Sequence, residues 1–410
     1  MNCGFSMQTL RTIYRPFAIL LLLAIYPFGS VFAQSPTAEA DIDYQFGEWI
    51  KIHAMVSQAE DVKSVQAFIQ TPNENNTWLS QAVEPENGKA TLEFNPQEMG
   101  LRAFSDLEYW VEVVSQGGEI SNTPKETFYY EDNRFEWKTL SKEPFEIFWH
   151  EGDSGFGLSL LDVSQQGLNH IQTILPVPSP EHIRLYAYAN AADMRATLQN
   201  TSQNWVGAHT DPDLGVMVVS LPPSPEQRLE MERQIPHELM HLLLYQKVGQ
   251  AYVNLPPWLN EGLSSIAELF PNSDYQRFME DAYKENALLP ISQLCKPFPR
   301  DAAGAYLAYA EAASFTRYLH EQYGSLLIDQ LVRQYANGLD CERGIEVALG
   351  SSMDQLEREW RRETLGEDPW LTALTNLAPW LLLLFAILAV PIILVIVTLR
   401  GKPKASAANR

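Results

Sequence analysis

Two histidines and two glutamates in the second half of the chain have the spacing of a metal-dependent hydrolase. Residues 237–241 read H-E-L-M-H, which fits the pattern H-E-x-x-H. Residues four apart lie on one face of a helix, so His237 and His241 can direct imidazole nitrogens at one metal ion. Glu238 lies about 100° round the same turn, which suits it to hold the attacking water. Glu261 could supply the third protein ligand that a catalytic zinc needs beside its open position.

Two helices are expected to position these side chains. The segment Gln227–Val248 reads as helical, and its run of leucines gives it apolar faces. Trp258–Phe270 follows a Pro-Pro pair and reads as a second helix, which could place Glu261 against the first. Pro236 either opens the motif helix at its first position or kinks a longer one. The competing interpretation is a surface helix with two incidental histidines.

The two elements together resemble a known group of peptidases. P-H-E-L-M-H at 236–241, followed by P-W-L-N-E-G-L-S at 257–264, is similar to the gluzincin metallopeptidases. The closer similarity is to the peptidase MA-like domains of bacterial extracytoplasmic proteins, whose post-site helix the segment 309–324 also resembles. The resemblance covers residues 145–364. It implies an α+β zincin-like metallopeptidase domain: a mixed sheet whose edge strand receives substrate, the motif helix, and a helical second half.

Carried onto this sequence, the resemblance assigns zinc to His237, His241 and Glu261. Zinc would polarise the scissile carbonyl and lower the pKa of the attacking water toward about 7. Glu238 would be the general base, and would then pass the proton to the leaving amine.

A tyrosine is the candidate donor to the developing oxyanion. Many gluzincins place a Tyr or His there, and Tyr309 is our candidate, with Tyr306 and His320 behind it. The other interpretation of this segment is a packed helical stripe. Its members would be Tyr306, Tyr309, Ala313, Thr316 and Leu319.

Two polar residues near Glu261 are candidates for supporting roles. Ser265 lies one turn further along and could orient a zinc ligand, although an acidic residue would be the stronger partner at that place. Asn260 could instead help to position substrate.

The rest of the peptidase-like region alternates between expected strands and helices. Strands are expected at Phe145–His150, His182–Ala189 and Gly215–Ser220. By resemblance, the strand at Gly215–Ser220 lies beside the cleft and pairs with extended substrate. The expected helices are Gly155–Leu175, Ala191–Gln199, Asp274–Leu289 and Ser325–Ala336.

Short strand-like runs separated by turns precede this region. Their partial alternation of apolar residues predicts an all-β sandwich of immunoglobulin or fibronectin type over residues 40–132. The runs are Asp43–Val56, Val62–Thr71, Lys89–Phe94, Leu107–Ser115 and Glu126–Tyr130. This unit could capture substrate or serve as a spacer or packing module.

The N-terminal segment has the layout of a secretory signal peptide. Arg11 and Arg15 precede an apolar run, and small residues stand at positions −3 and −1 of a cleavage site after Ala33. A signal peptide is therefore expected over residues 1–33. An uncleaved anchor is the alternative.

The C-terminal segment indicates a membrane anchor. Residues 377–399 are almost wholly apolar and exceed the roughly 20 residues that span a bilayer. The tail, residues 400–410, carries basic residues and no acid, so it is expected on the cytoplasmic side. The predicted protein crosses the cell membrane once, with its catalytic part outside.

The charge balance argues against two classes of partner. The chain has 29 basic and 51 acidic residues and a net charge of −22. Basic residues at the two ends lie outside the predicted extracytoplasmic part, which is therefore more acidic still. Nucleic acids and anionic membrane faces both need basic patches, so neither is an expected partner of this part.

Three cysteines are present, and Cys3 lies within the predicted signal peptide. Cys295 and Cys341 remain. In an oxidising compartment they could form a bridge that closes a loop of about 46 residues and contributes about 3–4 kcal/mol. Two buried thiols are the alternative, and we favour the bridge.

These features predict a membrane-anchored extracytoplasmic zinc-dependent metallopeptidase that hydrolyses a peptide or protein substrate. No motif for gripping a substrate α-amino group is recognisable, which favours an endopeptidase over an aminopeptidase. The alternative function is a catalytically silent surface binding or adhesion protein that keeps the peptidase fold and β-sandwich as scaffold. The sequence leaves the substrate and the oligomeric state open.

Overall fold

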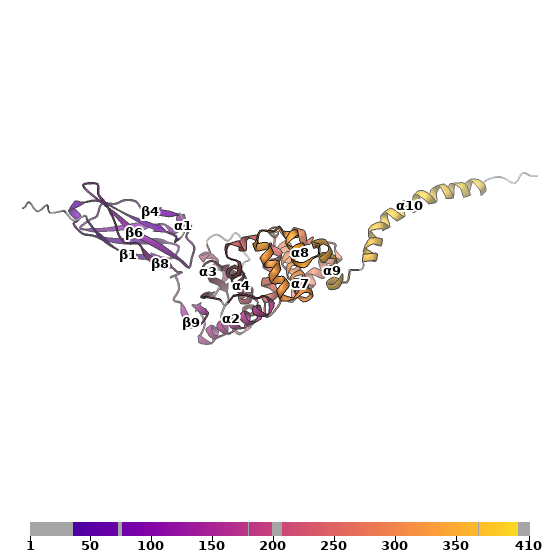
Figure 1. The fold of residues 1–410 in the computed structure, drawn as a ribbon, viewed down its shortest axis with the longest axis horizontal. Helices are drawn as coiled ribbons and strands as arrows, with labels where there is room; N and C mark the ends of the chain where they lie inside the picture. Colours follow the sequence, from indigo (N-terminus) through magenta and orange to yellow (C-terminus); the bar gives the residue numbers. More distant parts are fainter. Residues whose placement is uncertain (1–35, 73–75, 179, 199–206, 368, 401–410) are drawn as a thin grey trace, which may run out of the picture.

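The chain divides into a β-rich part, an α+β part and a long C-terminal helix, in that order (Figure 1). The computed structural model describes residues 36–72, 76–178, 180–198, 207–367 and 369–400. The predicted signal peptide, residues 1–33, lies outside the described residues. So does the predicted tail after Arg400.

Two antiparallel sheets build the β-rich part, and their inward-facing residues share one apolar core. Buried and more exposed residues alternate along the strands Lys89–Phe94 and Ser105–Ser115, as the pleat requires when one face is covered. The first sheet contains β1 (Ala38–Gln45), β2 (Trp49–Val56) and β5 (Lys89–Phe94). The second contains β3 (Val62–Gln70), β4 (Thr77–Leu79), β6 (Ser105–Ser115), β7 (Ile120–Asn122) and β8 (Glu126–Tyr130). The immunoglobulin or fibronectin type stays a prediction.

The expected strand at Asp43–Val56 is instead parts of two strands joined by a tight turn. β1 and β2 pair antiparallel from Ala38 with Val56 to Gln45 with Trp49. Gly47 at the turn has a φ of +71°, a left-handed conformation that glycine adopts without steric cost. The prediction failed because apolar residues continue through the turn.

A five-stranded mixed sheet organises the α+β part. Its order is β12-β13-β11-β10-β9, in which the three central strands run parallel and the two outer strands run antiparallel. The strands are β9 (Lys138–Lys142), β10 (Phe145–Trp149), β11 (Ile183–Tyr188), β12 (Ala208–Asp211) and β13 (Val216–Ser220).

The predicted place of the Gly215–Ser220 strand at the cleft is wrong. The strand is β13, which lies between β12 and β11, and its first four residues are fully buried. A continuous apolar run is typical of a strand covered on both faces. The outer strand is β12, which the sequence analysis missed because Ala-His-Thr-Asp has neither alternation nor strong strand propensity.

The two faces of this sheet are covered by different parts of the chain. On one face, Leu185 and Met217 join a core formed with α2 (Ser154–Ile174) and α4 (Arg228–Val248). On the other face, the alternate residues of β11 and β13 join the core of the β-rich part. These residues are Tyr186, Tyr188, Val216 and Val218. The β-rich part therefore packs directly on the peptidase-like sheet, near α3 (Ala191–Thr197).

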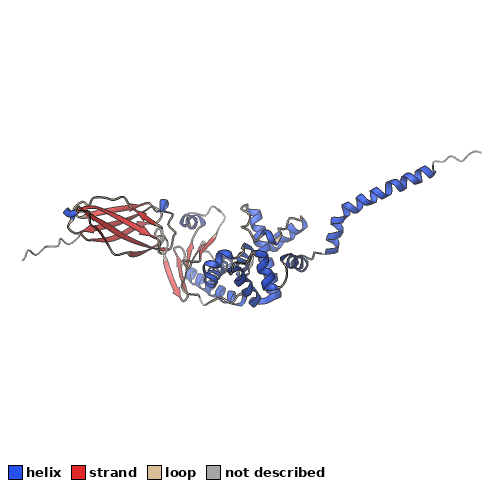
Figure 2. Cartoon of the chain, turned by 45° about the horizontal axis from the view of Figure 1, so that its top comes forward, coloured by secondary structure: helices blue, strands red, loops and turns tan. Residues whose placement is uncertain are grey.

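Helices make up the second half of the α+β part, on the side away from the β-rich strands (Figure 2). They are α5 (Pro257–Ala267), α6 (Ser273–Lys284), α7 (Ala302–Ala336), α8 (Cys341–Leu349) and α9 (Met353–Leu365), with short 3₁₀ turns at Gly249–Asn254 and Ile291–Gln293. The predicted helix at Ser325–Ala336 is the second part of α7, which has a break at Gly324, where φ is +73°. Pro236 lies inside α4, so the motif helix is a longer one.

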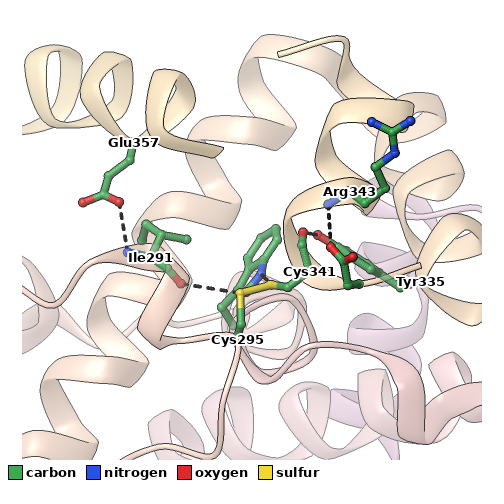
Figure 3. Close-up of a disulfide and its surroundings, with 8 residues drawn as sticks. Ile291, Cys295, Tyr335, Cys341, Arg343 and Glu357 are labelled. Carbon is green, nitrogen blue, oxygen red and sulfur yellow. Dashed lines mark hydrogen bonds between the residues drawn. A yellow bond between two sulfur atoms is a disulfide. The ribbon is translucent and has the colours of Figure 1, made fainter. Parts of the chain in front are cut away.

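A disulfide joins Cys295 to Cys341, which confirms the predicted bridge (Figure 3). Cys295 follows the turn at Ile291–Gln293, and Cys341 is the first residue of α8. The indole N–H of Trp258 donates to the sulfur of Cys341 at 3.3 Å, and its backbone N–H donates to the Leu294 carbonyl at 3.1 Å. The bridge therefore fastens the residues against which the start of α5 rests.

The last helix, α10 (Pro369–Arg400), includes the apolar segment Leu377–Val397. This segment has a mean hydropathy of 3.2 and is long and apolar enough to cross a membrane. None of it is buried against the rest of the chain. The apolar segment begins at Leu377, as predicted, and the helix that contains it starts earlier, at Pro369.

Removal of the disulfide is expected to destabilise the α+β part. In the Cys295→Ser/Cys341→Ser protein the unfolded chain regains the freedom of a 46-residue loop, so the free energy of unfolding should fall by about 3–4 kcal/mol. Urea unfolding of the full chain in detergent, followed by tryptophan fluorescence, measures this. An unchanged midpoint would contradict the prediction.

A buried glutamate is expected to make stability depend on pH. Glu311 on α7 is fully buried, and burial raises the pKa of its carboxyl from 4.5 to about 8. One oxygen accepts the Leu289 N–H at 2.9 Å, and the other has no hydrogen-bond partner among the described residues. Between pH 4.5 and about 8 the unfolded state ionises while the folded state stays protonated. The free energy of unfolding therefore falls as pH rises through this window.

The Glu311→Gln variant should lose this part of the pH dependence. As pH rises from 4.5 to 7, its free energy of unfolding should increase relative to that of the natural chain by on the order of 3 kcal/mol. Urea unfolding at a series of pH values tests it, with Glu285→Gln, at an exposed position, as the matched control. Parallel curves for the natural chain and Glu311→Gln would refute this role.

Candidate metal centre

Three side chains from α4 and α5 converge on one point. Nε2 of His237 lies 3.5 Å from Oε2 of Glu261, and Nε2 of His241 lies 3.6 Å from the same oxygen. One ligand atom from each of the three residues can be chosen so that all lie within 4.8 Å of one another. Two imidazole nitrogens and one carboxylate are a donor set that suits zinc. The structure thus brings together all three predicted metal ligands.

Close packing of two helices fixes this convergence. A Cβ added to Gly262 would lie 2.0 Å from Oγ1 of Thr316 and 2.6 Å from the Ala312 carbonyl oxygen, both on α7. Only glycine therefore allows α5 to approach α7 so closely. Trp258 in the first turn of α5 is fully buried and has an edge-on contact with Phe315. These contacts set the rotation of α5 that presents Glu261 to α4.

The outward-facing nitrogen of each histidine has its own partner. Nδ1 of His237 lies 3.2 Å from Oε1 of Glu268. Nδ1 of His241 lies 3.1 Å from both Ser264 Oγ and Tyr252 Oη, and 3.2 Å from Asn260 Oδ1. Each contact leaves Nε2 to point at Glu261. Partners of this kind fix the tautomer and the ring orientation of metal-ligating histidines.

Of the two supporting roles predicted from the sequence, the one for Ser265 is wrong. Ser265 contacts neither histidine, and its buried hydroxyl has no hydrogen-bond partner among the described residues. Asn260 contacts His241 and donates to Tyr252 at 2.9 Å, and its role in positioning substrate stays a prediction. The acidic partner is Glu268, which the sequence analysis missed. Its position two helical turns after Glu261, on the same face, was the available signal.

Charge at the centre is balanced between the histidines and the carboxylates. Burial lowers the pKa of His237, but hydrogen bonds to Glu261 and Glu268 outweigh it and raise the pKa to about 10. Burial raises the pKa of Glu261, but the charges of His241 and His237 outweigh it, and the net shift is downward. The carboxylates therefore create a strong demand for positive charge at this point.

Glu238 lies on α4 beside β12, the outer strand of the described sheet. The Thr210 hydroxyl on β12 donates to Oε2 of Glu238 at 2.6 Å. The Glu238 side chain is largely buried but also lines a cleft of about 470 Å³. The predicted base is therefore held at the wall of a cavity that also reaches His237.

Tyr309 and Tyr306 line the same cleft, whereas His320 does not. Burial raises the pKa of Tyr309, and the charges of Glu261 and Glu238 raise it further. The Tyr306 hydroxyl accepts from Asn272 at 2.8 Å. His320 contacts Ser325 at the break in α7. Of the three predicted candidates, Tyr309 thus keeps the best position for an oxyanion donor, which stays a prediction.

The model of the Peptidase MA superfamily matches residues 163–366. The match supports a zincin-like peptidase domain in this part of the chain. The matched residues include the motif helix, Glu261 and the helices that follow. A comparison with curated proteins found no match to the chain.

Neutralising Glu268 is expected to weaken metal binding by the peptidase domain. Replacing Glu268 with Gln removes the negative charge behind His237, and partners of this kind typically contribute about 10–100-fold to affinity. Competition with a chromophoric zinc chelator measures the affinity. Ser265→Ala is the matched control, since its hydroxyl touches neither histidine. Equal affinities for natural chain and Glu268→Gln would exclude the assigned role.

Proposed function

We propose that the protein is a membrane-anchored, extracytoplasmic zinc metallopeptidase that acts as an endopeptidase. The observation that carries this proposal is that His237, His241 and Glu261 direct one ligand atom each to a common point. The Nδ1 atoms of both histidines contact polar partners. The match of residues 163–366 to a peptidase superfamily supports it independently.

Each residue of the site has a role in this proposal. His237, His241 and Glu261 hold the zinc, which when bound supplies Lewis acidity toward the scissile carbonyl and the attacking water. Glu238 accepts the proton of that water and passes it to the leaving nitrogen. Tyr309 donates to the oxygen on which negative charge develops.

The backbone of β12 is suited to hold an extended substrate. The Ser220 N–H donates to the Gly207 carbonyl at 2.8 Å, and β12 continues antiparallel to β13 from there. Hydrogen-bonded and non-hydrogen-bonded pairs alternate along such a ladder. Ala208 and Thr210 therefore direct their N–H and C=O groups to the open side of the strand. A peptide can add there as a further strand, beside Glu238.

The location follows from the two ends of the chain. The predicted signal peptide at 1–33 and the apolar segment Leu377–Val397 support export followed by anchoring through one helix. The basic residues after this helix support a cytoplasmic tail. The disulfide supports an oxidising compartment for the α+β part.

Replacement of Glu238 should separate metal binding from peptide hydrolysis. The natural chain in detergent is expected to bind one zinc and to cleave members of a pool of unrelated peptides, read by mass spectrometry. Glu238→Ala should keep the zinc and lose about 10²–10⁴-fold in rate, because only the proton transfer is removed.

His237→Ala is the control that should lose both zinc and cleavage. Cleavage that survives in Glu238→Ala would exclude this residue as the base. Absence of both zinc and cleavage in the natural chain would turn the assignment toward the binding or adhesion protein.

A further inference from the structure

We propose that Arg102 of the β-rich part is a positioning residue for peptide hydrolysis, because it fixes the strand that holds both Glu238 and the substrate backbone. The proposal rests on the proposed peptidase function. Arg102 lies between α1 (Pro96–Met99) and β6, far in sequence from the catalytic motif. It reaches across the interface between the β-rich part and the peptidase domain.

Arg102 binds two aspartates at the end of β12. Its guanidinium donates to both carboxylate oxygens of Asp213, at 2.7 and 2.8 Å, and to Oδ1 of Asp211 at 2.8 Å. A two-pronged arginine–carboxylate contact fixes orientation as well as distance. Asp211 is the last residue of β12, and Asp213 lies in the turn that leads to β13. Arg102 therefore fastens one end of the hairpin.

The strand that it fastens is short and lies at the edge of the described sheet. β12 has four residues, all half-buried, and it is the outermost strand of the described sheet. The hydroxyl of Thr210 on this strand donates to Oε2 of Glu238 at 2.6 Å. Thr210 directly precedes Asp211, so a shift of the aspartate displaces the hydroxyl that orients the base.

The loop that carries Arg102 is itself held in one conformation. Phe104 has a φ of +59°, in the left-handed region that bulky residues avoid. Such strain persists only where the surroundings enforce it. Here the Phe104 N–H donates to the Tyr130 carbonyl at 2.8 Å. The Phe104 ring stacks on the ring of Tyr186 in β11, with 3.9 Å between the ring centroids. The loop is thus anchored to both parts at once.

Buried polar contacts nearby keep the two parts in fixed register. Asp132 is fully buried and accepts from Tyr188 of β11 and Thr197 of α3, each at 2.8 Å. It also pairs with Arg134 at 2.7 Å. Because this network and the Phe104 stack hold the interface independently, loss of Arg102 should loosen β12 without separating the parts.

A double-mutant cycle between Arg102 and Thr210 tests the proposal. We expect Arg102→Ala and Thr210→Val each to lower kcat/KM about 10-fold, with part of the loss in kcat. If Arg102 acts through the Thr210–Glu238 contact, the double variant should lose well under the 100-fold of independent sites. A multiplicative loss near 100-fold would overturn the proposal, as would no loss in Arg102→Ala.

The substrate in this cycle is the fastest-cleaved peptide of the unrelated pool, used with the full chain in detergent. Arg102→Lys keeps the charge but loses the two-pronged contact, so its activity should be intermediate. The matched control is Lys51→Ala, which removes an ion pair with Glu93 elsewhere on the β-rich part. Its kcat and KM should equal those of the natural chain.

Amide hydrogen exchange gives a readout that needs no activity. Residues 207–215 should exchange faster in Arg102→Ala than in the natural chain or in Lys51→Ala, while the α4 amides keep their protection. If residues 207–215 exchange faster in Arg102→Ala but the natural chain cleaves no peptide, the role of Arg102 in holding β12 stands and the peptidase function is rejected. If exchange is unchanged in Arg102→Ala while the natural chain cleaves peptide, only the role of Arg102 in holding β12 is overturned.

Discussion

The convergence of two imidazole Nε2 atoms on one carboxylate oxygen is the arrangement on which the site depends. His237 and His241 are brought together by one helix, but Glu261 belongs to another. Its position is set by how closely α5 can approach α7. That approach requires Gly262, because any Cβ there would overlap Thr316 and the α7 backbone. The burial of Trp258 and its contact with the disulfide then fix the start of α5.

The second requirement is that each histidine present the same nitrogen to the centre. Glu268 and the hydroxyls of Ser264 and Tyr252 occupy the Nδ1 sides. Ser264 lies in α5, Tyr252 in the turn before it and Glu268 directly after it, so the segment that carries Glu261 also orients both rings. One short stretch of chain therefore carries the third candidate ligand and the hydrogen-bond partners of the other two.

The β-rich part and the peptidase sheet share one apolar core. Tyr186 and Tyr188 of β11 are buried in its core, and Asp132 binds their strand through a hydroxyl. The sheet is thereby covered on both faces, as its apolar central strands require. A detachable spacer would need a polar outer face on this sheet. The tyrosines and valines found there favour the packing-module interpretation over a free spacer.

How much of this could be predicted depended on the range of the interactions involved. The i, i+4 spacing of His237 and His241 is a property of any helix, so the sequence predicted their shared face. The apolar helix at the C-terminus could also be predicted, because its length and composition suffice to recognise it. The disulfide could be predicted because only two cysteines remain after the predicted signal peptide. Short elements such as β4, β7 and β12 were missed, since three or four residues carry too little periodicity to separate strand from loop.

The sequence by itself determined the chemistry available to this protein: two imidazoles on one helical face, a neighbouring glutamate and a candidate third ligand, followed by a segment long and apolar enough to cross a membrane. Only the tertiary structure decided which groups surround them. Glu268 rather than Ser265 supports His237, and β12 rather than β13 borders the cleft. Arg102 meets Asp211 and Asp213 across more than a hundred residues of chain. Such contacts depend on how whole elements pack, which no local pattern encodes.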